Sequence, residues 1–325
     1  MIEQRELGRS GIVVTRIILG CGNFGGVGSA PALFGQGIPR EEAPRIMDAA
    51  WELGITTFDT ADAYGGGRSE TWIGEWLAEK GSEVRDAITI ETKTFNPMAE
   101  GEDRGLSRPR IRRQIESSLG RLGIERIPLY MAHAPDPDTP VEETLAALDE
   151  LVRAGNVGAV GASNYAAEQL AEAVEISELE GLTRYEWVQN SFSLLDRGDA
   201  DTVFPVCRER SLGYEVHTPI AGGWLAGRYR RGQAYPEGSR MTQRPDGYRR
   251  FENDAVFDAL EAFEREALGR GVSMAGLALA WLLGVPEVTA VVVGPTRAEQ
   301  LEPVREALAL ELSAEEHLHL GGLFP

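Results

Sequence analysis

The chain has 325 residues, of which 42% are apolar, and its formal net charge is −19 at pH 7. A net charge of this sign and size repels nucleic acid and anionic lipid, and the sequence contains no basic stripe that would counter it. No run approaches the roughly 18 apolar residues of a membrane span, and the N-terminal residues are charged where a signal peptide would be apolar. We therefore expect a soluble, cytoplasmic protein without nucleic-acid or membrane partners.

The two cysteines, Cys21 and Cys207, lie far apart and match neither a disulfide framework nor a metal site. We expect both to be small core residues and expect no bound metal. Lysine occurs only at Lys80 and Lys93, while arginine supplies every other basic side chain. Because the pKa of a lysine can be tuned and arginine stays charged, a lysine in an apolar strand suggests chemistry.

At the start of the chain, the segment from Arg5 to Val14 alternates around Gly8-Arg9-Ser10-Gly11 and predicts a small hairpin. Eight short apolar or β-branched runs then predict strands: 14–19, 56–60, 88–93, 129–133, 157–161, 187–190, 214–218 and 288–293. Between them, apolar residues at three- and four-residue spacing predict helices, including 41–53, 108–122, 141–154 and 166–176.

This alternation predicts a single (β/α)8 TIM barrel, of the α/β class, over residues 1–325, with the N-terminal hairpin closing its bottom. No G-x-G-x-x-G follows the first strand, which disfavours an open doubly wound sheet. Two connections, 25–39 and 227–247, are long and rich in glycine and proline, and the second is also rich in arginine. Loops of this length in a compact domain are usually functional or mobile.

Polar residues end three consecutive predicted strands. Asp59 ends the second, Lys93 ends the third and His133 ends the fourth, while Tyr64 lies in the loop after Asp59. Reactive groups of such barrels lie at the carboxyl ends of the strands, and neighbouring strands are roughly 4.8 Å apart. Each residue alone has an ordinary structural explanation, such as a helix cap or a strand-end lysine. Together on one rim they favour a catalytic site.

The four groups suit the reduction of a carbonyl. Hydride arriving at the carbon leaves an alkoxide that needs a proton, and a phenol has an ordinary pKa of roughly 10. We assign Tyr64 as the general acid and expect the ammonium of Lys93 to lower its pKa. Asp59 would hold the lysine, and His133 would position the carbonyl oxygen.

The segments Phe58-Asp59-Thr60-Ala61 with Tyr64-Gly65, then Thr92-Lys93, then His133, resemble the tetrad of the aldo-keto reductases. Further motifs at family-like intervals extend the resemblance over almost the whole chain: Leu7-Gly8-Arg9-Ser10-Gly11, Arg68-Ser69-Glu70, Gly161-Ala162-Ser163-Asn164-Tyr165, Gln189-Asn190, Pro219-Ile220-Ala221-Gly222-Gly223 and Glu299-Gln300-Leu301. The resemblance implies an oxidoreductase of aldehydes or ketones that binds NADP (NADPH) across the rim without a Rossmann domain.

The resemblance also implies a set of cofactor-binding residues. Ser163, Asn164 and Gln189 would hold the nicotinamide carboxamide, and His217 stands where relatives carry an aromatic that stacks on the ring. The remaining members follow the seventh and eighth strands: Pro219, Ile220, Gly222, Arg228, Gly294, Thr296, Arg297 and Gln300. Thr296 and Arg297, with the backbone N–H groups of the next helix, suit a 2′-phosphate, and Arg228 is a weaker phosphate candidate.

Two departures from the family pattern and one costly residue stand out. Val304 replaces an asparagine that often meets the adenine, which weakens adenine recognition by analogy. An unperturbed His217 would titrate near pH ~6.5, and its positive charge beside the ring should then weaken NADP⁺ binding selectively. Glu91 shares a strand face with Lys93 and should point into the barrel, where an unpaired carboxylate is costly, and the sequence suggests no partner for it.

Two other functions compete with the reductase. Potassium-channel β subunits share this type of barrel, so a binding or sensing subunit is one alternative, and an aldolase with Lys93 as a Schiff base is another. Phe24, Trp224 and the two long loops are candidate walls of a substrate pocket. The sequence leaves the substrate and the oligomeric state open.

Overall fold

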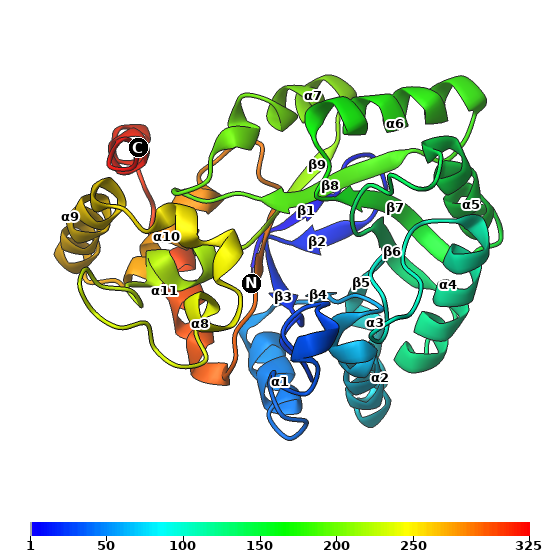
Figure 1. The fold of residues 1–325 in the computed structure, drawn as a ribbon, viewed down its shortest axis with the longest axis horizontal. Coiled ribbons are helices and arrows are strands. Elements are labelled where there is room, and N and C mark those ends of the chain that lie inside the picture. The colour runs from blue at the N-terminus through cyan, green and yellow to red at the C-terminus, as the bar shows by residue number, and fades with distance from the viewer. Residues whose placement is uncertain (1) are drawn as a thin grey trace.

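The computed structural model describes residues 2–325, and its centre is a closed barrel of eight parallel strands (Figure 1). The barrel strands are β3 Ile17–Gly20, β4 Thr57–Asp59, β5 Thr89–Thr94, β6 Ile127–Ala132, β7 Val157–Ser163, β8 Tyr185–Ser191, β9 Gly213–His217 and β10 Ala290–Val293. They pair in chain order, and β10 closes the ring between β9 and β3. The predicted (β/α)8 barrel is confirmed.

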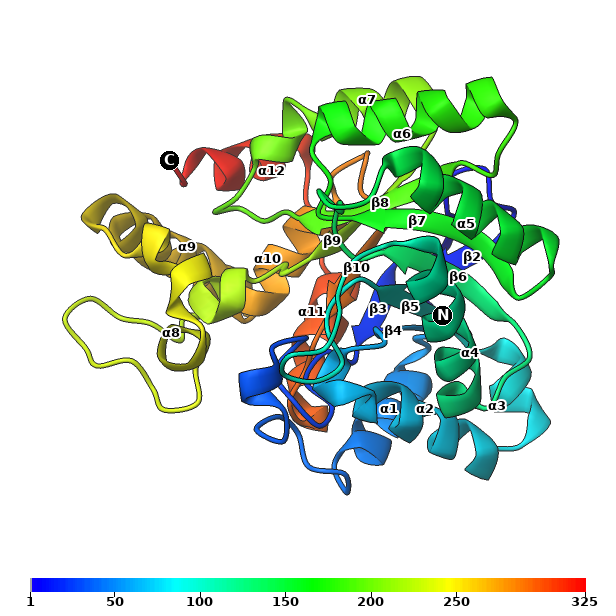
Figure 2. The same ribbon diagram turned by 45° about the vertical axis from the view of Figure 1, so that its right-hand side comes forward.

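Helices surround the barrel on its outer side (Figures 1 and 2). They are α1 Ala43–Leu53, α2 Arg68–Glu79, α3 Ser82–Ala87, α4 Arg108–Leu122, α5 Val141–Arg153, α6 Ala167–Glu180, α7 Val203–Arg210, α8 Arg240–Gln243, α9 Asp254–Arg270, α10 Met274–Leu283, α11 Glu302–Ala309 and α12 Ala314–Gly322. Helix α4 illustrates why they form: Ile111 and Ile115 are buried against the barrel, whereas Arg112 and Arg113 are exposed. Gly123, with φ 65°, ends this helix in the left-handed conformation.

The N-terminal hairpin consists of β1 Gln4–Glu6 and β2 Val13–Thr15, paired antiparallel. Leu7 in its turn is fully buried and packs with Val14, Ile18 and Trp187 inside the barrel. A Cβ at Gly213, the first residue of β9, would lie 2.8 Å from Leu7 Cδ1, so the hairpin closes the amino end of the barrel as predicted.

The predicted first strand, 14–19, is two strands in the structure. The chain leaves the hairpin and enters the barrel at Arg16, which is buried. The guanidinium of Arg16 donates to the carbonyl oxygens of Leu283, at 3.0 Å, and Val288, at 3.1 Å. These long-range contacts hold the break between β2 and β3, and apolar periodicity alone could not reveal them.

The barrel interior is apolar at the amino end and polar toward the carboxyl end. Leu129 and Trp187 belong to the lower apolar cluster. Higher up, Glu91 and Lys93 on β5 are fully buried and make polar contacts across the interior. Side chains that alternate along β5 therefore bring charged groups to the inner face of the carboxyl rim.

The two long connections fold against that rim. In the first, Ile38 forms an isolated bridge with Phe24, which directly precedes the connection. The second contains α8, and its preceding loop, yellow-green in Figure 2, projects from the body of the molecule. Arg240 at the start of α8 donates to Asn23 Oδ1 at 2.8 Å, so the second connection contacts the segment directly before the first. Helices long and apolar enough to cross a membrane are absent from residues 2–325.

Candidate functional site

The four predicted catalytic residues lie together at the carboxyl rim. Lys93 Nζ donates to Asp59 Oδ2, and it also reaches the carbonyl oxygen of Thr60 at 3.0 Å and Tyr64 Oη at 3.5 Å. The ring of Tyr64 meets His133 edge-on, with 5.5 Å between the ring centroids. Asp59 and Lys93 are buried, whereas Tyr64 and His133 are half-buried, so the reactive edge of the cluster faces outward.

The glycine turn after β4 places Tyr64 over the barrel. Tyr64 begins a short 3₁₀ turn, and Gly65, Gly66 and Gly67 follow it with φ values of 59°, 69° and 89°. A Cβ at Gly65 would lie 2.5 Å from the carbonyl oxygen of Phe24. Only glycine fits at this point, because the backbone is left-handed and the neighbouring loop is too close for any side chain.

Lys93 is a buried ammonium. Burial lowers the pKa of Lys93, but the negative charge of Asp59 opposes this effect, and the pKa lies above its usual value. A lysine that stays protonated and hydrogen-bonded to a carboxylate is a poor nucleophile. The geometry therefore disfavours the alternative in which Lys93 forms a Schiff base.

The pKa of Tyr64 differs from the expectation. Burial raises the pKa of Tyr64 to about 12, and Lys93 only partly offsets this rise. Lys93 lowers the pKa as expected, but the net shift is upward, because removing the phenolate from water outweighs the attraction of one ammonium that is itself shared with Asp59. Tyr64 is therefore a protonated phenol throughout the neutral range, which is the form that can give up a proton.

His133 is a neutral imidazole. Burial lowers the pKa of His133 well below its usual value, and Lys93 adds to the effect. Asn96, in the loop after β5, has its Nδ2 3.2 Å from His133 Nδ1. With Asn96 as donor, the ring proton is on Nε2 and is available to an oxygen at the rim. The sequence interpretation missed Asn96, although its position three residues after Lys93 was a signal.

The predicted amide-binding residues form a connected network at the end of β7 and on β8. Ser163 Oγ donates to the carbonyl oxygen of Gln189 at 2.8 Å, and Asn164 Nδ2 donates to the carbonyl oxygen of His133 at 2.9 Å. Asn164 is exposed and has φ 61°, an uncommon conformation that asparagine tolerates. Gln189 Nε2 donates to Asp59 Oδ2 at 2.9 Å, which joins this network to the catalytic cluster.

His217 is locked between two polar groups. Its Nε2 lies 3.0 Å from Asn164 Oδ1 and its Nδ1 lies 2.9 Å from Thr218 Oγ1. Burial lowers the pKa of His217 to about 4, and Lys93 contributes to this shift. The expected titration near pH ~6.5 therefore does not apply to this residue in the folded protein.

The other predicted cofactor residues follow β9 and β10. Thr296 donates from both its backbone N–H, at 2.7 Å, and its hydroxyl, at 3.1 Å, to Gln300 Oε1. The side chain of Arg297 is 66% exposed. Arg228 and Gly294 are also exposed, whereas Pro219 is buried and Ile220 and Gly222 are half-buried. Most of these groups are thus open to a ligand at the same rim.

Two rim residues were missed by the sequence interpretation. Asn23 Nδ2 donates to the carbonyl oxygen of Gly294 at 3.3 Å, and Arg240 donates to the Oδ1 of the same side chain. Burial lowers the pKa of Arg240, and the nearby guanidinium groups of Arg244 and Arg228 lower it further. Arginines of the 227–247 connection therefore gather near the rim, and the arginine-rich composition of that loop was the available signal.

The two predicted pocket residues are fully buried. Trp224 packs in an aromatic cluster, with ring centroids 5.0 Å from Tyr229 and 5.5 Å from Phe257. Phe24 packs against Trp72, with 6.5 Å between centroids. Neither side chain presents surface to a substrate in this structure, because Phe24 packs against α2 and Trp224 packs against Tyr229 and α9.

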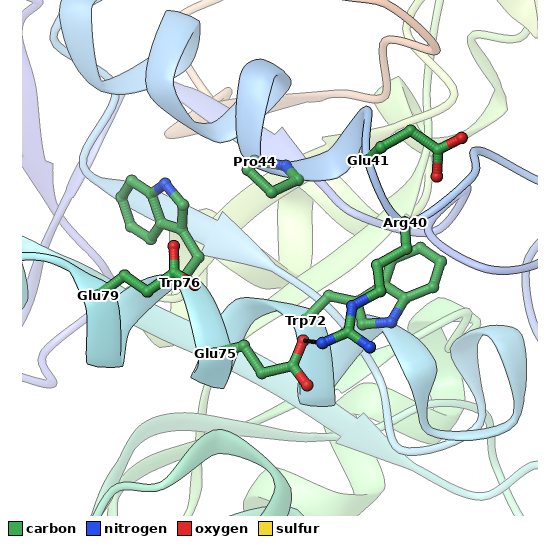
Figure 3. Close-up of a pocket in the computed structure, with 7 residues that line it drawn as sticks. All are labelled: Arg40, Glu41, Pro44, Trp72, Glu75, Trp76 and Glu79. Atoms are coloured by element: carbon green, nitrogen blue, oxygen red, sulfur yellow. Dashed lines mark ion pairs between the residues drawn. The ribbon is translucent and has the colours of Figure 1, made fainter.

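Figure 3 shows a hollow of about 320 Å³ that lies elsewhere, on the outside of the barrel. It is lined by Arg40, Glu41, Pro44, Trp72, Glu75, Trp76 and Glu79. Arg40 and Glu75 pair across it at 2.8 Å, and it contains no member of the catalytic cluster. We place the site at the rim because the titratable groups converge there. In the part of the chain that the structure describes, no group of three or more His, Cys, Asp or Glu could hold a metal ion.

Comparison with known proteins gives one consistent result. Residues 16–322 match the model of the aldo/keto reductase family. An uncharacterized oxidoreductase, YrpG, of Bacillus subtilis (strain 168) is 34% identical over 100% of this chain and 96% of its own. L-glyceraldehyde 3-phosphate reductase of Escherichia coli (strain K12) is 33% identical over 94% of this chain and 88% of its own. A probable voltage-gated potassium channel subunit beta of Arabidopsis thaliana is 30% identical over 94% and 91%, respectively.

Proposed function

The chain belongs to the aldo/keto reductase family, and from this we propose that it is a cytoplasmic enzyme that uses NADPH to reduce an aldehyde or ketone. The observation that carries the proposal is the cluster of Asp59, Lys93, Tyr64 and His133, with its open edge at the rim. Family membership supports carbonyl reduction in general. Our proposal adds three points to this general activity: the use of NADPH, the role of Tyr64 as the acid and the cytoplasmic location.

The residues divide the reaction as follows. The reduced nicotinamide, when bound, supplies the hydride that adds to the carbonyl carbon. His133 Nε2–H donates to the carbonyl oxygen and orients it, and Tyr64 gives its phenolic proton to that oxygen as negative charge develops. Lys93 stabilises the phenolate that remains, and Asp59 holds Lys93 in place. Because Tyr64 is only half-buried, it can regain a proton from solvent.

The rim fits a nicotinamide. Gln189 turns its amide nitrogen toward Asp59 and Glu215, and its Oε1 has no partner among the described residues and is not enclosed. This oxygen can accept from a carboxamide N–H group, and the exposed Asn164 follows directly after Ser163, the register partner of Gln189. The arginines near the rim supply the local positive charge that a phosphorylated cofactor needs in a chain of net charge −19.

Arg297 tests the preference for NADPH. We expect Arg297→Ala to weaken NADPH binding about tenfold or more and to change NADH binding little, because a charge-assisted bond to the 2′-phosphate is lost. Arg305→Ala is the matched control: its side chain is 56% exposed and pairs with Glu302 on α11. Fluorescence titration with both cofactors measures the effect. Equal losses for NADPH and NADH in Arg297→Ala would exclude the phosphate role.

The histidines provide a prediction about pH. Since the pKa values of His217 and His133 are lowered, both rings are neutral in the folded protein at pH 5.5–7.5. We expect their NMR signals not to titrate in this range. Both histidines take up protons more readily in the unfolded chain than in the folded protein. Their contribution to folding stability is therefore present above about pH 6.5 and is lost as the pH falls below it. A His217 signal that titrates near pH ~6.5 contradicts the hydrogen-bonded geometry.

The proposed reaction is tested directly with a panel of aldehydes, ketones and sugars in the presence of NADPH. The panel should include a phosphorylated aldehyde, since one relative is an L-glyceraldehyde 3-phosphate reductase. Because some relatives are potassium channel β subunits, a binding role is the second candidate function for this chain. Steady turnover at ordinary enzyme rates favours the reductase, whereas tight NADPH binding without turnover on any member of the panel favours the binding role.

A further inference from the structure

Two glutamates lie buried inside the barrel near Lys93. Glu91 on β5 and Glu215 on β9 are both fully buried. Glu91 is two residues before Lys93, and Glu215 is the register partner of Gln189. The mechanism above uses neither residue, although burying two carboxyl groups beside a catalytic cluster is costly.

Each carboxyl group has one oxygen that accepts from a neighbour. Trp187 Nε1 donates to Glu91 Oε1 at 3.0 Å, and Gln189 Nε2 donates to Glu215 Oε2 at 3.2 Å. The other two oxygens, Glu91 Oε2 and Glu215 Oε1, are buried and have no hydrogen-bond partner within residues 2–325. The two glutamates are close enough that the charge of Glu215 raises the pKa of Glu91.

Two ionised carboxylates cannot satisfy these two oxygens, because neither has a proton to donate. If both were charged, two like charges would lie close together in the barrel, with Asp59 adding a third to balance the single ammonium of Lys93. One proton between the two glutamates removes the repulsion and satisfies both unpaired oxygens.

The surroundings decide which glutamate carries the proton. Burial raises the pKa of Glu91 well above its usual range, and the negative charges of Glu215 and Asp59 raise it further. Burial also raises the pKa of Glu215, but only to about 7, because the neighbouring Glu91 and Gln189 stabilise its charge. Glu91 is therefore the neutral donor, and Glu215 is the charged acceptor.

The charged glutamate has a consequence for Gln189. Asp59 and Glu215 both accept from Gln189 Nε2, so two carboxylates hold the amide nitrogen in place. The amide oxygen then remains available to accept a hydrogen bond. We propose that Glu91 and Glu215 share one proton, and that Glu215 is a positioning residue that fixes the amide of Gln189 with its oxygen free for a ligand.

The neighbouring titratable groups leave one uncompensated negative charge. Asp59 and Lys93 form an ion pair, and burial keeps the pKa of the Cys21 thiol well above its usual value. Tyr64 stays protonated, and His133 and His217 stay neutral. Glu215 is thus the one unpaired charge of this group, and it is one hydrogen bond from the proposed carboxamide ligand Gln189.

The first experiment detects the proton. Infrared spectra of the parent and of Glu91→Gln at pH 8 are expected to differ by one protonated carboxylic acid band, present in the parent and lost in the variant. The subtraction cancels Asp62, whose pKa burial raises to about 7. A difference spectrum without that band overturns the shared proton. This measurement needs no cofactor, so its outcome is independent of the proposed reaction.

The second experiment tests the positioning role and rests on the proposed cofactor. In Glu91→Gln the new amide can replace the proton donor to Glu215, so NADPH and NADP⁺ affinities should stay within about twofold of the parent. The double variant Glu91→Gln with Glu215→Gln has nearly the same shape as the parent but no charge at position 215. The amide nitrogens of Gln189 and of the residue at 215 then compete for the same hydrogen-bond acceptors.

Both cofactor forms should bind more weakly to the double variant than to Glu91→Gln. NADP⁺ should lose about tenfold more affinity than NADPH, because the oxidised ring is cationic and one nearby negative charge has been removed. Equal losses for the two forms, or no loss, overturn the positioning role. Circular dichroism and urea unfolding establish that both variants are folded, and if the double variant is not, Glu215→Gln alone must show the same selective loss of NADP⁺.

Discussion

Tyr64→Phe is expected to lower kcat for carbonyl reduction by a factor on the order of 10² to 10⁴, the range typical of a lost general acid. The substitution removes one hydroxyl group, and the ring that packs edge-on against His133 remains. NADPH affinity should therefore stay close to that of the parent. Steady-state kinetics and fluorescence titration measure the two quantities on the same preparation.

Tyr185→Phe is the matched control for this experiment. Tyr185 is fully buried, and its hydroxyl lies 3.4 Å from that of Tyr165, away from the catalytic cluster. This variant also loses one phenolic hydroxyl and should keep kcat within a few-fold of the parent. If Tyr64→Phe kept the parent kcat while a deuterium isotope effect showed chemistry to be rate-limiting, another group would have to be the acid.

Lys93→Met is expected to have a large effect on both activity and stability. The substitution leaves Asp59 buried without its cation, and breaking a buried pair in this way typically costs about 3–5 kcal/mol. The loss should shrink as the pH falls, since an unpaired buried Asp59 has a raised pKa and can become neutral by taking up a proton. The midpoint of urea unfolding, followed from pH 5 to pH 8, measures this.

The double variant Asp59→Asn with Lys93→Met separates stability from chemistry. It removes both charges, so it should recover part of the stability lost in Lys93→Met, although Gln189 then loses a charged acceptor. It should not recover reductase activity, because no ammonium remains to stabilise the phenolate of Tyr64. A double variant as unstable as Lys93→Met would show that the unpaired charge is not the cause, and recovered activity would contradict the role of Lys93.

The order of elements along the chain and the position of the catalytic cluster could be predicted from the sequence. Both depend on local patterns: a strand is a short β-branched run, and parallel strands present their carboxyl ends at one rim. Asp59, Lys93 and His133 each come at or just after the end of such a run, so their meeting follows from topology alone. Family membership likewise follows from motifs spread over the whole chain.

The electrostatic state of these groups was decided by the tertiary structure. The pKa of Tyr64 rises and that of His217 falls because burial outweighs the nearest charge, and sequence spacing does not measure burial. Glu91 had no predictable partner, because Glu215 is 124 residues further along the chain and reaches it only across the closed barrel. Local patterns determined which groups reach the rim, whereas packing across the barrel determined which of them carry a charge.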